Sequence, residues 1–235
     1  MLYKLLDACR EKGCPVCRVE QYSVERYLEN QFYENVNSPK WRGHLRGSLG
    51  FCHEHAWLAV DKRLGDALGF SLIYQDILKS ILKTLDDGGN LQSASRPRSS
   101  SLKKLPDQAR TFKENSLNAM IPVRRCPVCE HREETARMIL SALVEGLDKA
   151  EVVEALQSSD ALCLPHLQQS LTLVREHSVS EQLLAIHRSK LEGLVAELAE
   201  FIRKNDYLNI HEGFGKERDA WMRAIAQVVG SSKRK

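Results

Sequence analysis

The sequence contains no apolar run long enough to cross a membrane. A spanning helix needs about 20 consecutive apolar residues, and no stretch of the 235 residues approaches that length. The N-terminal segment has neither the length nor the apolar centre of a secretory signal peptide. We therefore expect a cytoplasmic protein with no membrane partner.

Aromatic residues and strand-like alternation are both scarce. Aromatics account for 6% of the chain, against 43% for all hydrophobic residues. No segment alternates apolar and polar side chains as a half-buried strand does. Apolar residues recur instead at helical spacing, which predicts helices with one buried face and an all-α fold. The 34 basic and 31 acidic residues leave a net charge of only +3, so bulk charge does not predict binding to nucleic acid.

Four short cysteine motifs stand out against this background. Two are identical CPVC tetrapeptides, and each is followed by a Cys-x2-His tetrapeptide. The four motifs are Cys14-Pro15-Val16-Cys17, Cys52-His53-Glu54-His55, Cys126-Pro127-Val128-Cys129 and Cys163-Leu164-Pro165-His166. The gaps within the two copies, residues 18–51 and 130–162, are almost equal in length. This repetition predicts an internal duplication into two helical repeats.

Each copy supplies three cysteines and one histidine, a known ligand set for structural zinc. Taking the motifs in chain order, we predict one site formed by Cys14, Cys17, Cys52 and His55, and a second formed by Cys126, Cys129, Cys163 and His166. His55 is preferred over His53 because only His55 aligns with His166. We expect two zinc ions per chain, each joining helices within one repeat and leaving no coordination position open for a substrate.

Each half-site is expected at the start of a helix. Proline is favoured at the first helical position, so Cys14 and Cys126 are predicted N-caps, each with a second cysteine on the same helix face. Free backbone N–H groups and the positive end of the helix dipole stabilise negative charge there. Such positions favour the thiolate, which is the form that binds a metal.

Iron–sulfur clusters are the alternative cofactor. Cys9, Cys14 and Cys17 have the spacing of a plant-type ferredoxin, which would suit an electron-transfer or redox-sensing protein. Ile121 stands at the equivalent of Cys9 in the second copy, so the pattern is not shared. Mixed Cys/His sets are also more typical of structural zinc. Cys9 is otherwise interpreted as a small apolar residue beside the site.

Composition divides the chain into four segments. Residues 1–87 form the first metal-binding repeat, 88–121 a basic flexible linker, 122–204 the second repeat, and 205–235 a C-terminal helical extension. We predict helices over 1–13, 16–35, 41–49, 128–146, 148–156, 163–176 and 180–204, and one long helix over 53–85 that is bent near Gly65 or Gly69 and stops at Gly88-Gly89. A last amphipathic helix with Trp221, Ala224, Ile225 and Val228 is expected to pack on the protein's own core, with docking on a partner as the alternative.

The motifs contain no arrangement of side chains typical of a catalytic site, such as a Ser/His/Asp triad or an activated Cys/His pair. Every cysteine near a histidine is assigned to a metal, and Glu54 beside His55 faces a site with no open position. The remaining histidines are interpreted as surface or hydrogen-bonded core residues: His44, His131, His177, His187 and His211. We therefore predict a non-enzymatic interaction or regulatory module whose partner is another protein. The alternative is nucleic-acid binding through the basic residues of the linker and tail, which are Arg96, Arg98, Lys103, Lys104, Lys233, Arg234 and Lys235.

The paired motifs, together with the stretch Phe201-Ile202-Arg203-Lys204-Asn205-Asp206-Tyr207 and the later Trp221, resemble an uncharacterised bacterial family, a domain of unknown function. The resemblance covers most of the chain outside residues 88–121. It implies no activity, so the ligand assignment depends on the residues themselves.

Overall fold

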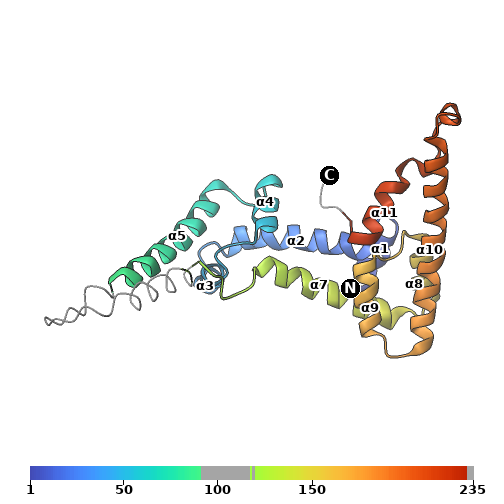
Figure 1. Cartoon of the computed structure of the whole chain (residues 1–235). Helices are drawn as coiled ribbons and strands as arrows, with labels where there is room; N and C mark the ends of the chain where they lie inside the picture. The colour runs from blue at the N-terminus through green and yellow to red at the C-terminus, as the bar shows by residue number, and fades with distance from the viewer. Residues whose placement is uncertain (91–116, 118–119, 232–235) are drawn as a thin grey trace, which may run out of the picture. The chain divides into compact units, whose positions relative to one another are not determined.

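The computed structural model describes residues 1–90, 117 and 120–231, and within them every regular element is a helix (Figure 1). In chain order these are α1 (Leu2–Cys9), α2 (Pro15–Glu34), α3 (Pro39–Gly47), α4 (His53–Asp61), α5 (Ala67–Asn90), α7 (Pro127–Gly146), α8 (Ala150–Ser158), α9 (Leu164–Leu173), α10 (His177–Lys204), the short 3-10 helices η1 (Ile210–Glu212) and η2 (Lys216–Asp219), and α11 (Ala220–Val229). The predicted all-α fold is confirmed. Among the described helices, none combines the length and the apolarity needed to cross a lipid bilayer.

The helices that follow the two CPVC motifs match in order and length. α2 and α7 contain 20 residues each, and α3 and α8 contain 9 each. α4 and α9 contain 9 and 10 residues, while α5 and α10 contain 24 and 28. α2 and α7 both begin at the proline of their CPVC motif, the residue whose missing N–H suits the first helical position. These matches agree with an internal duplication, which stays a prediction.

Contacts divide the helices into two compact units. Unit 1 contains residues 1–23 and 132–235, and unit 2 contains residues 24–131. The boundaries fall inside α2 and α7, so each of these helices gives its first residues to one unit and its later residues to the other. This grouping differs from the sequential segments 1–87 and 122–204, which describe repeats of the sequence rather than compact units.

Unit 1 is built around aliphatic side chains. Leu5 of α1, Leu143 of α7, Leu156 of α8 and Leu183 of α10 are all fully or almost fully buried in its core. Cys9 is buried in the same core, as expected for a small apolar residue. Burial raises the pKa of its thiol, which keeps it uncharged at neutral pH.

In unit 2, aromatic rings gather around Phe32. Its ring centroid lies 4.4 Å from that of Phe70 and 6.2 Å from that of Trp41. A Cβ on Gly65 would come within 2.6 Å of the Phe32 ring, so glycine is required there. The chain turns at this point, because Arg63 has a φ of 54° and Leu64 enters the core. The prediction of one helix over 53–85 is therefore wrong, since α4 and α5 are separate.

α5 continues to Asn90, beyond the expected stop at Gly88-Gly89. Most of the predicted linker, residues 88–121, lies outside the described residues, and so do its four named basic side chains and Lys233–Lys235 of the tail.

α11 corrects the predicted packing of the last helix. Trp221, Ile225 and Val228 were expected in the core, but their exposed fractions are 48%, 55% and 56%. The face of α11 turned toward the rest of unit 1 carries Ala220 and Gln227 instead. Gln227 Nε2 donates a hydrogen bond to the carbonyl oxygen of Leu162 at 2.5 Å. This polar anchor fixes the rotation of α11 and leaves its apolar face outside.

Candidate metal centres

The eight predicted ligands converge in two groups of four, but these groups are not the two sequence copies. The first group, here called the Cys14 cluster, consists of Cys14, Cys17, Cys163 and His166, and the second, the Cys52 cluster, consists of Cys52, His55, Cys126 and Cys129. Within each cluster all ligand atoms lie within 4.8 Å of one another. The predicted pairing within each copy is therefore wrong. Each CPVC motif joins the Cys-x2-His motif of the other copy.

The length of α2 explains this exchange. A helix of 20 residues extends about 30 Å, and Cys14 and Cys17 lie at its start, in unit 1. The later residues Val24 and Leu28 belong to the core of unit 2, against which Cys52 packs. The first CPVC motif and the Cys-x2-His motif that follows it in the chain thus belong to different units. The start of α7, which carries the second CPVC motif, lies in unit 2 and takes its place.

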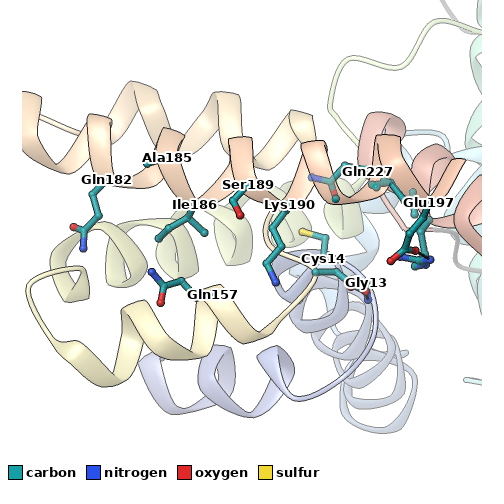
Figure 2. A pocket seen from close by; sticks show the side chains of 15 residues that line it. Gly13, Cys14, Gln157, Gln182, Ala185, Ile186, Ser189, Lys190, Glu197 and Gln227 are labelled. Atoms are coloured by element: carbon teal, nitrogen blue, oxygen red, sulfur yellow. Dashed lines mark hydrogen bonds and ion pairs between the residues drawn. The ribbon is translucent and has the colours of Figure 1, made fainter. Parts of the chain in front are cut away.

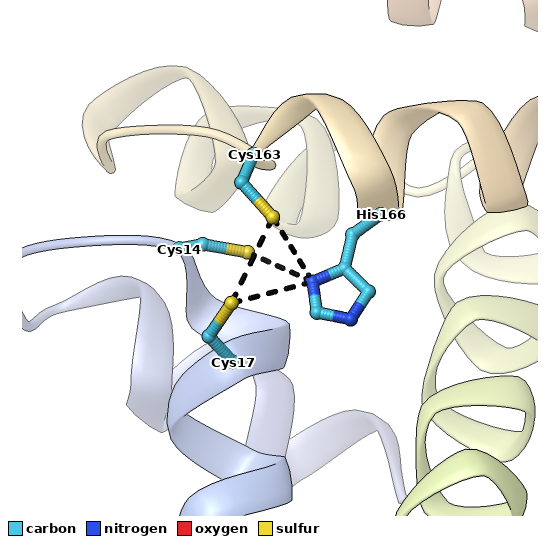
Figure 3. Close-up of side chains that lie close together, drawn as sticks. All are labelled: Cys14, Cys17, Cys163 and His166. Atoms are coloured by element: carbon cyan, nitrogen blue, oxygen red, sulfur yellow. Dashed lines mark hydrogen bonds between the residues drawn. The ribbon is translucent and has the colours of Figure 1, made fainter. Parts of the chain in front are cut away.

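The Cys14 cluster has a compact arrangement of three sulfurs around one imidazole nitrogen (Figure 3). The Nδ1 atom of His166 lies 3.4 Å from the Sγ atoms of Cys14 and Cys17 and 3.2 Å from that of Cys163. The Sγ atoms of Cys17 and Cys163 are 3.7 Å apart, far beyond the 2.05 Å or so of a disulfide. All four side chains therefore point their donor atoms at one position between the starts of α2 and α9.

The Cys52 cluster repeats this geometry in unit 2. His55 Nδ1 lies 3.2 Å from Cys52 Sγ, 3.4 Å from Cys129 Sγ and 3.8 Å from Cys126 Sγ. The Sγ atoms of Cys52 and Cys129 are 3.6 Å apart. His55 is fully buried, whereas His53 is exposed. The choice of His55 over His53 as the member of the cluster is thus confirmed.

All four half-sites occupy helix starts, as predicted. Cys52 and Cys163 are the N-caps of α4 and α9, and Cys14 and Cys126 directly precede α2 and α7. Hydrogen bonds from Cys14 and Cys163 lower the pKa of Cys17, so the cluster stabilises one thiolate. A metal requires thiolate ligands, and the geometry therefore suits metal binding.

His166 is held on both sides of its ring. Glu20 Oε2 lies 3.5 Å from His166 Nε2, and both side chains are largely buried. Burial disfavours protonation of His166, but hydrogen bonds with Cys14, Cys17 and Glu20 raise its pKa to about 12. A metal bound at Nδ1 would displace the proton on that side and leave the Nε2 proton directed at Glu20. A carboxylate behind a ligating histidine fixes its ring and raises its basicity.

Glu20→Gln is expected to weaken Zn²⁺ binding by the Cys14 cluster by about 10- to 100-fold. The second copy has Arg132 at the equivalent position, so the Cys52 cluster should keep its affinity. A competition titration with a chromophoric chelator would separate the two binding steps. Glu29→Gln changes an exposed residue of the same helix and serves as the control. Equal weakening of both steps would contradict a role of Glu20 at one cluster.

The backbone next to Cys163 is fixed by side chains far along the chain. His187 Nε2 accepts a hydrogen bond from the N–H of Leu162 at 3.0 Å, and His187 Nδ1 lies 2.7 Å from the carbonyl oxygen of Leu183. Gln227 donates to the carbonyl oxygen of Leu162. Leu162 is thus bound through both of its backbone polar groups, which positions Cys163 at the start of α9. His187 is thus a hydrogen-bonded core residue, one of the two interpretations that the sequence offered for the five remaining histidines.

His187→Ala is expected to destabilise the protein by about 1–3 kcal/mol, because the buried Leu162 N–H loses its acceptor. Burial lowers the pKa of His187 from its usual 6.5, so the native state favours neutral imidazole. The stabilisation by His187 is complete above pH 6.5 and is lost as pH falls through the lower native pKa.

Urea unfolding of wild type and variant at about pH 8 and about pH 5.5 measures this dependence. The difference between the two proteins should shrink at the lower pH. His177→Ala, an exposed change on the same helix, should cost little at either pH. A difference that grows toward acid pH would contradict the assignment.

The residues that follow α11 close one side of the Cys14 cluster. A Cβ on Gly230 would lie 3.5 Å from Cys17 Sγ and 3.9 Å from Cys163 Sγ, so the backbone of Gly230 passes directly over the sulfurs. Gly230 has a φ of 92°, a conformation that favours glycine. The N–H of Cys14 donates to Ser231 Oγ at 3.3 Å. Gly230 and Ser231 therefore shield the cluster from water, a role that the sequence motifs did not reveal.

A pocket of about 690 Å³, lined by both polar and apolar side chains, borders Cys14 (Figure 2). It is lined by α8, α10, α11 and the segment before α2, with Gln157, Lys190 and Gln227 among its side chains. Most of its charges have partners: Arg223 pairs with Glu197, and Asp160 accepts the N–H of Gly13 at 2.6 Å. Cys14 is 4% exposed, so the pocket gives little access to the sulfur itself.

The other histidines lie outside both clusters. His44 contacts the Arg125 carbonyl oxygen and lies 3.6 Å from Glu130, and His177 pairs with Glu181. The His131 ring stacks on Tyr27 with 4.4 Å between centroids. Cys9 also belongs to neither cluster, so the ferredoxin-like spacing with Cys14 and Cys17 does not gather three ligands.

Comparison with known proteins places the chain in a family. The model of the family described as "Family of unknown function (DUF6062)" matches residues 4–235. The chain is also 24% identical over 229 residues to "Uncharacterized 23.9 kDa protein in xynA 3'region" from Caldicellulosiruptor sp. (strain Rt8B.4), with 97% of this chain and 100% of that protein covered. No solved structure matches the chain. The protein belongs to the DUF6062 family of unknown function.

Proposed function

We propose that each cluster binds one structural zinc ion and that the two ions hold the helices of a non-enzymatic protein that binds another protein. The observation that carries this proposal is the convergence of three sulfurs and one imidazole nitrogen at each cluster. Four protein ligands complete the tetrahedral coordination of zinc and leave no position for a substrate.

The spacing of the donor atoms favours a single ion over an iron–sulfur cluster. With zinc–sulfur bonds of about 2.3 Å, two sulfurs of a tetrahedral site are about 3.8 Å apart. The Sγ atoms of Cys17 and Cys163 are 3.7 Å apart, and those of Cys52 and Cys129 are 3.6 Å apart. Donors bound to different irons of a cluster would lie further apart than donors bound to one ion, whereas all four donor atoms of each group lie within 4.8 Å of one another. Zinc therefore remains our proposal for both sites.

Electrostatics also suits one divalent ion per cluster. Three thiolates and a neutral imidazole give a zinc site a net charge of −1. Two helix starts point at each cluster, and their free N–H groups and dipoles offset negative charge. The binding energy of such an ion becomes folding energy because the donors come together only in the native state.

The proposed protein partner follows from the surface of α11. Its five large apolar side chains, Trp221, Met222, Ile225, Val228 and Val229, are between 48% and 68% exposed. Exposed apolar patches of this kind, and tryptophan in particular, are typical of protein interfaces. A zinc ion with four protein ligands has no coordination position for a substrate, so we propose that the protein acts by binding a partner through this face.

Metal analysis of anaerobically purified protein tests the proposal. We expect two zinc ions per chain, one for each cluster, a colourless solution, and a large fall in thermal stability when a strong chelator removes the metal. A brown protein that contains iron and acid-labile sulfide would replace zinc by the iron–sulfur alternative. Chelation without any change in stability would show that the ions are not structural.

A further inference from the structure

One side of α10 carries apolar side chains that unit 1 does not bury. Leu184 is 46% exposed and Val195 is 64% exposed, and the half-buried Leu191 lies between them. These residues line a shallow groove that also contains Leu167 of α9. The side of α10 that faces its own unit is formed by Leu183, Ile186 and His187. In Figure 1, α9 and α11 lie along the same side of α10.

The exposed residues form a regular seam. Positions 184, 188, 191 and 195 are spaced by four, three and four residues, which places them on one helix face. The same spacing continues to Leu198 and to Ile202, which is 70% exposed. This spacing stays close to the helical repeat of about 3.6 residues, so the seam stays on one face of α10, along which a second helix can pack.

Two charged residues at this seam make it complementary to itself. Arg188 and Glu192 are both exposed and lie one helical turn apart, and neither has an ion-pair partner among the described residues. A two-fold axis perpendicular to α10 at the level of residue 190 would place Arg188 opposite Glu192 of the partner subunit. The same axis would pair Glu192 with Arg188 of the partner subunit, as an isologous contact requires.

We propose that the protein forms a homodimer in which α10 packs antiparallel to α10 of a second copy. Leu191 and Leu191 of the partner subunit then lie on either side of the axis, and Leu184 lies about one residue from the level of Val195 of the partner subunit. The reciprocal ion pairs flank this apolar centre. A parallel arrangement would instead oppose two arginines and two glutamates, and facing like charges are destabilising. The charge pattern therefore favours a second copy of the chain as the partner and an antiparallel orientation of the two α10 helices.

Charge reversal tests the dimer on the full-length, metal-loaded protein. Sedimentation velocity over a range of concentrations should find a dimer for wild type. Arg188→Glu alone and Glu192→Arg alone should each weaken dimerisation by at least about tenfold. The double variant Arg188→Glu with Glu192→Arg restores opposite charges across the axis and should return the dissociation constant to within about threefold of wild type.

Lys79→Glu reverses an exposed charge on α5 and should leave dimerisation unchanged. All variants change exposed residues, so metal content and circular dichroism should equal those of wild type. A wild type that stays monomeric at all concentrations would overturn the proposal. Single reversals without effect, or a double variant as weak as the singles, would overturn the antiparallel pairing.

Discussion

Cutting the chain between residues 91 and 116 is expected to leave residues 1–90 and 120–235 bound to each other. Each cluster takes two ligands from the part before this segment and two from the part after it. Each core likewise contains side chains from both parts, such as Val19 with Ile139 in unit 1 and Leu28 with Val128 in unit 2. A protease site introduced in this segment, followed by size-exclusion chromatography, measures the association.

Removal of the metal separates the contribution of the bound ions to this association from the contribution of the two hydrophobic cores. With its metal bound, the cleaved protein should elute as one species. When a chelator is added, its two parts should separate or unfold, because both ions that join them are removed together. Uncleaved protein treated in the same way is the control. Ligands paired within each copy would give the opposite result, in which the fragments separate at once and each keeps one ion.

The sequence contained enough information to identify the eight residues of the two clusters and the local structure around them. Proline at the first helical position and cysteine before it predicted the helix starts at residues 15 and 127. Alignment of the two copies selected His55 over His53. These inferences depend on a few neighbouring residues, and local preferences decide such features.

The pairing of the half-sites depends on tertiary contacts and could not be derived from spacing. Two CPVC motifs and two Cys-x2-His motifs have equivalent chemistry, so either combination satisfies two zinc sites. The choice follows from α2, whose first residues pack in unit 1 and whose later residues pack in unit 2. The predicted length of that helix was the one available clue, because about 30 Å of rigid rod separates its two ends.

The orientation of α11 escaped prediction for a different reason. Periodicity identifies the apolar face of a helix but not what covers it. In α11, the hydrogen bond from Gln227 to Leu162 and the ion pair of Arg223 with Glu197 turn the polar face toward the protein. The partners of these side chains lie 65 and 26 positions away in the chain, so a local sequence pattern does not predict these contacts.

Paired serine substitutions are expected to show directly that each ligand set combines the CPVC motif of one copy with the Cys-x2-His motif of the other. Cys14→Ser should remove one of the two ions, because three ligands hold zinc far more weakly than four. Adding Cys163→Ser should remove no further ion, since both residues belong to the Cys14 cluster. Combining Cys14→Ser with Cys52→Ser should remove both ions, one from each cluster. Metal content per chain, measured after dialysis, provides the count.

The stability of the same variants should also depend on which substituted residues belong to the same cluster. Loss of a structural ion is one of the few single changes that cost more than about 4 kcal/mol. Cys14→Ser and Cys163→Ser should be strongly non-additive because the second change removes a ligand from a site already lost. Hydrogen exchange should place the loosening in unit 1 for Cys163→Ser and in unit 2 for Cys52→Ser. If Cys14→Ser were non-additive with Cys52→Ser instead, the ions would be held within the sequence copies, and the exchange of half-sites between them would be wrong.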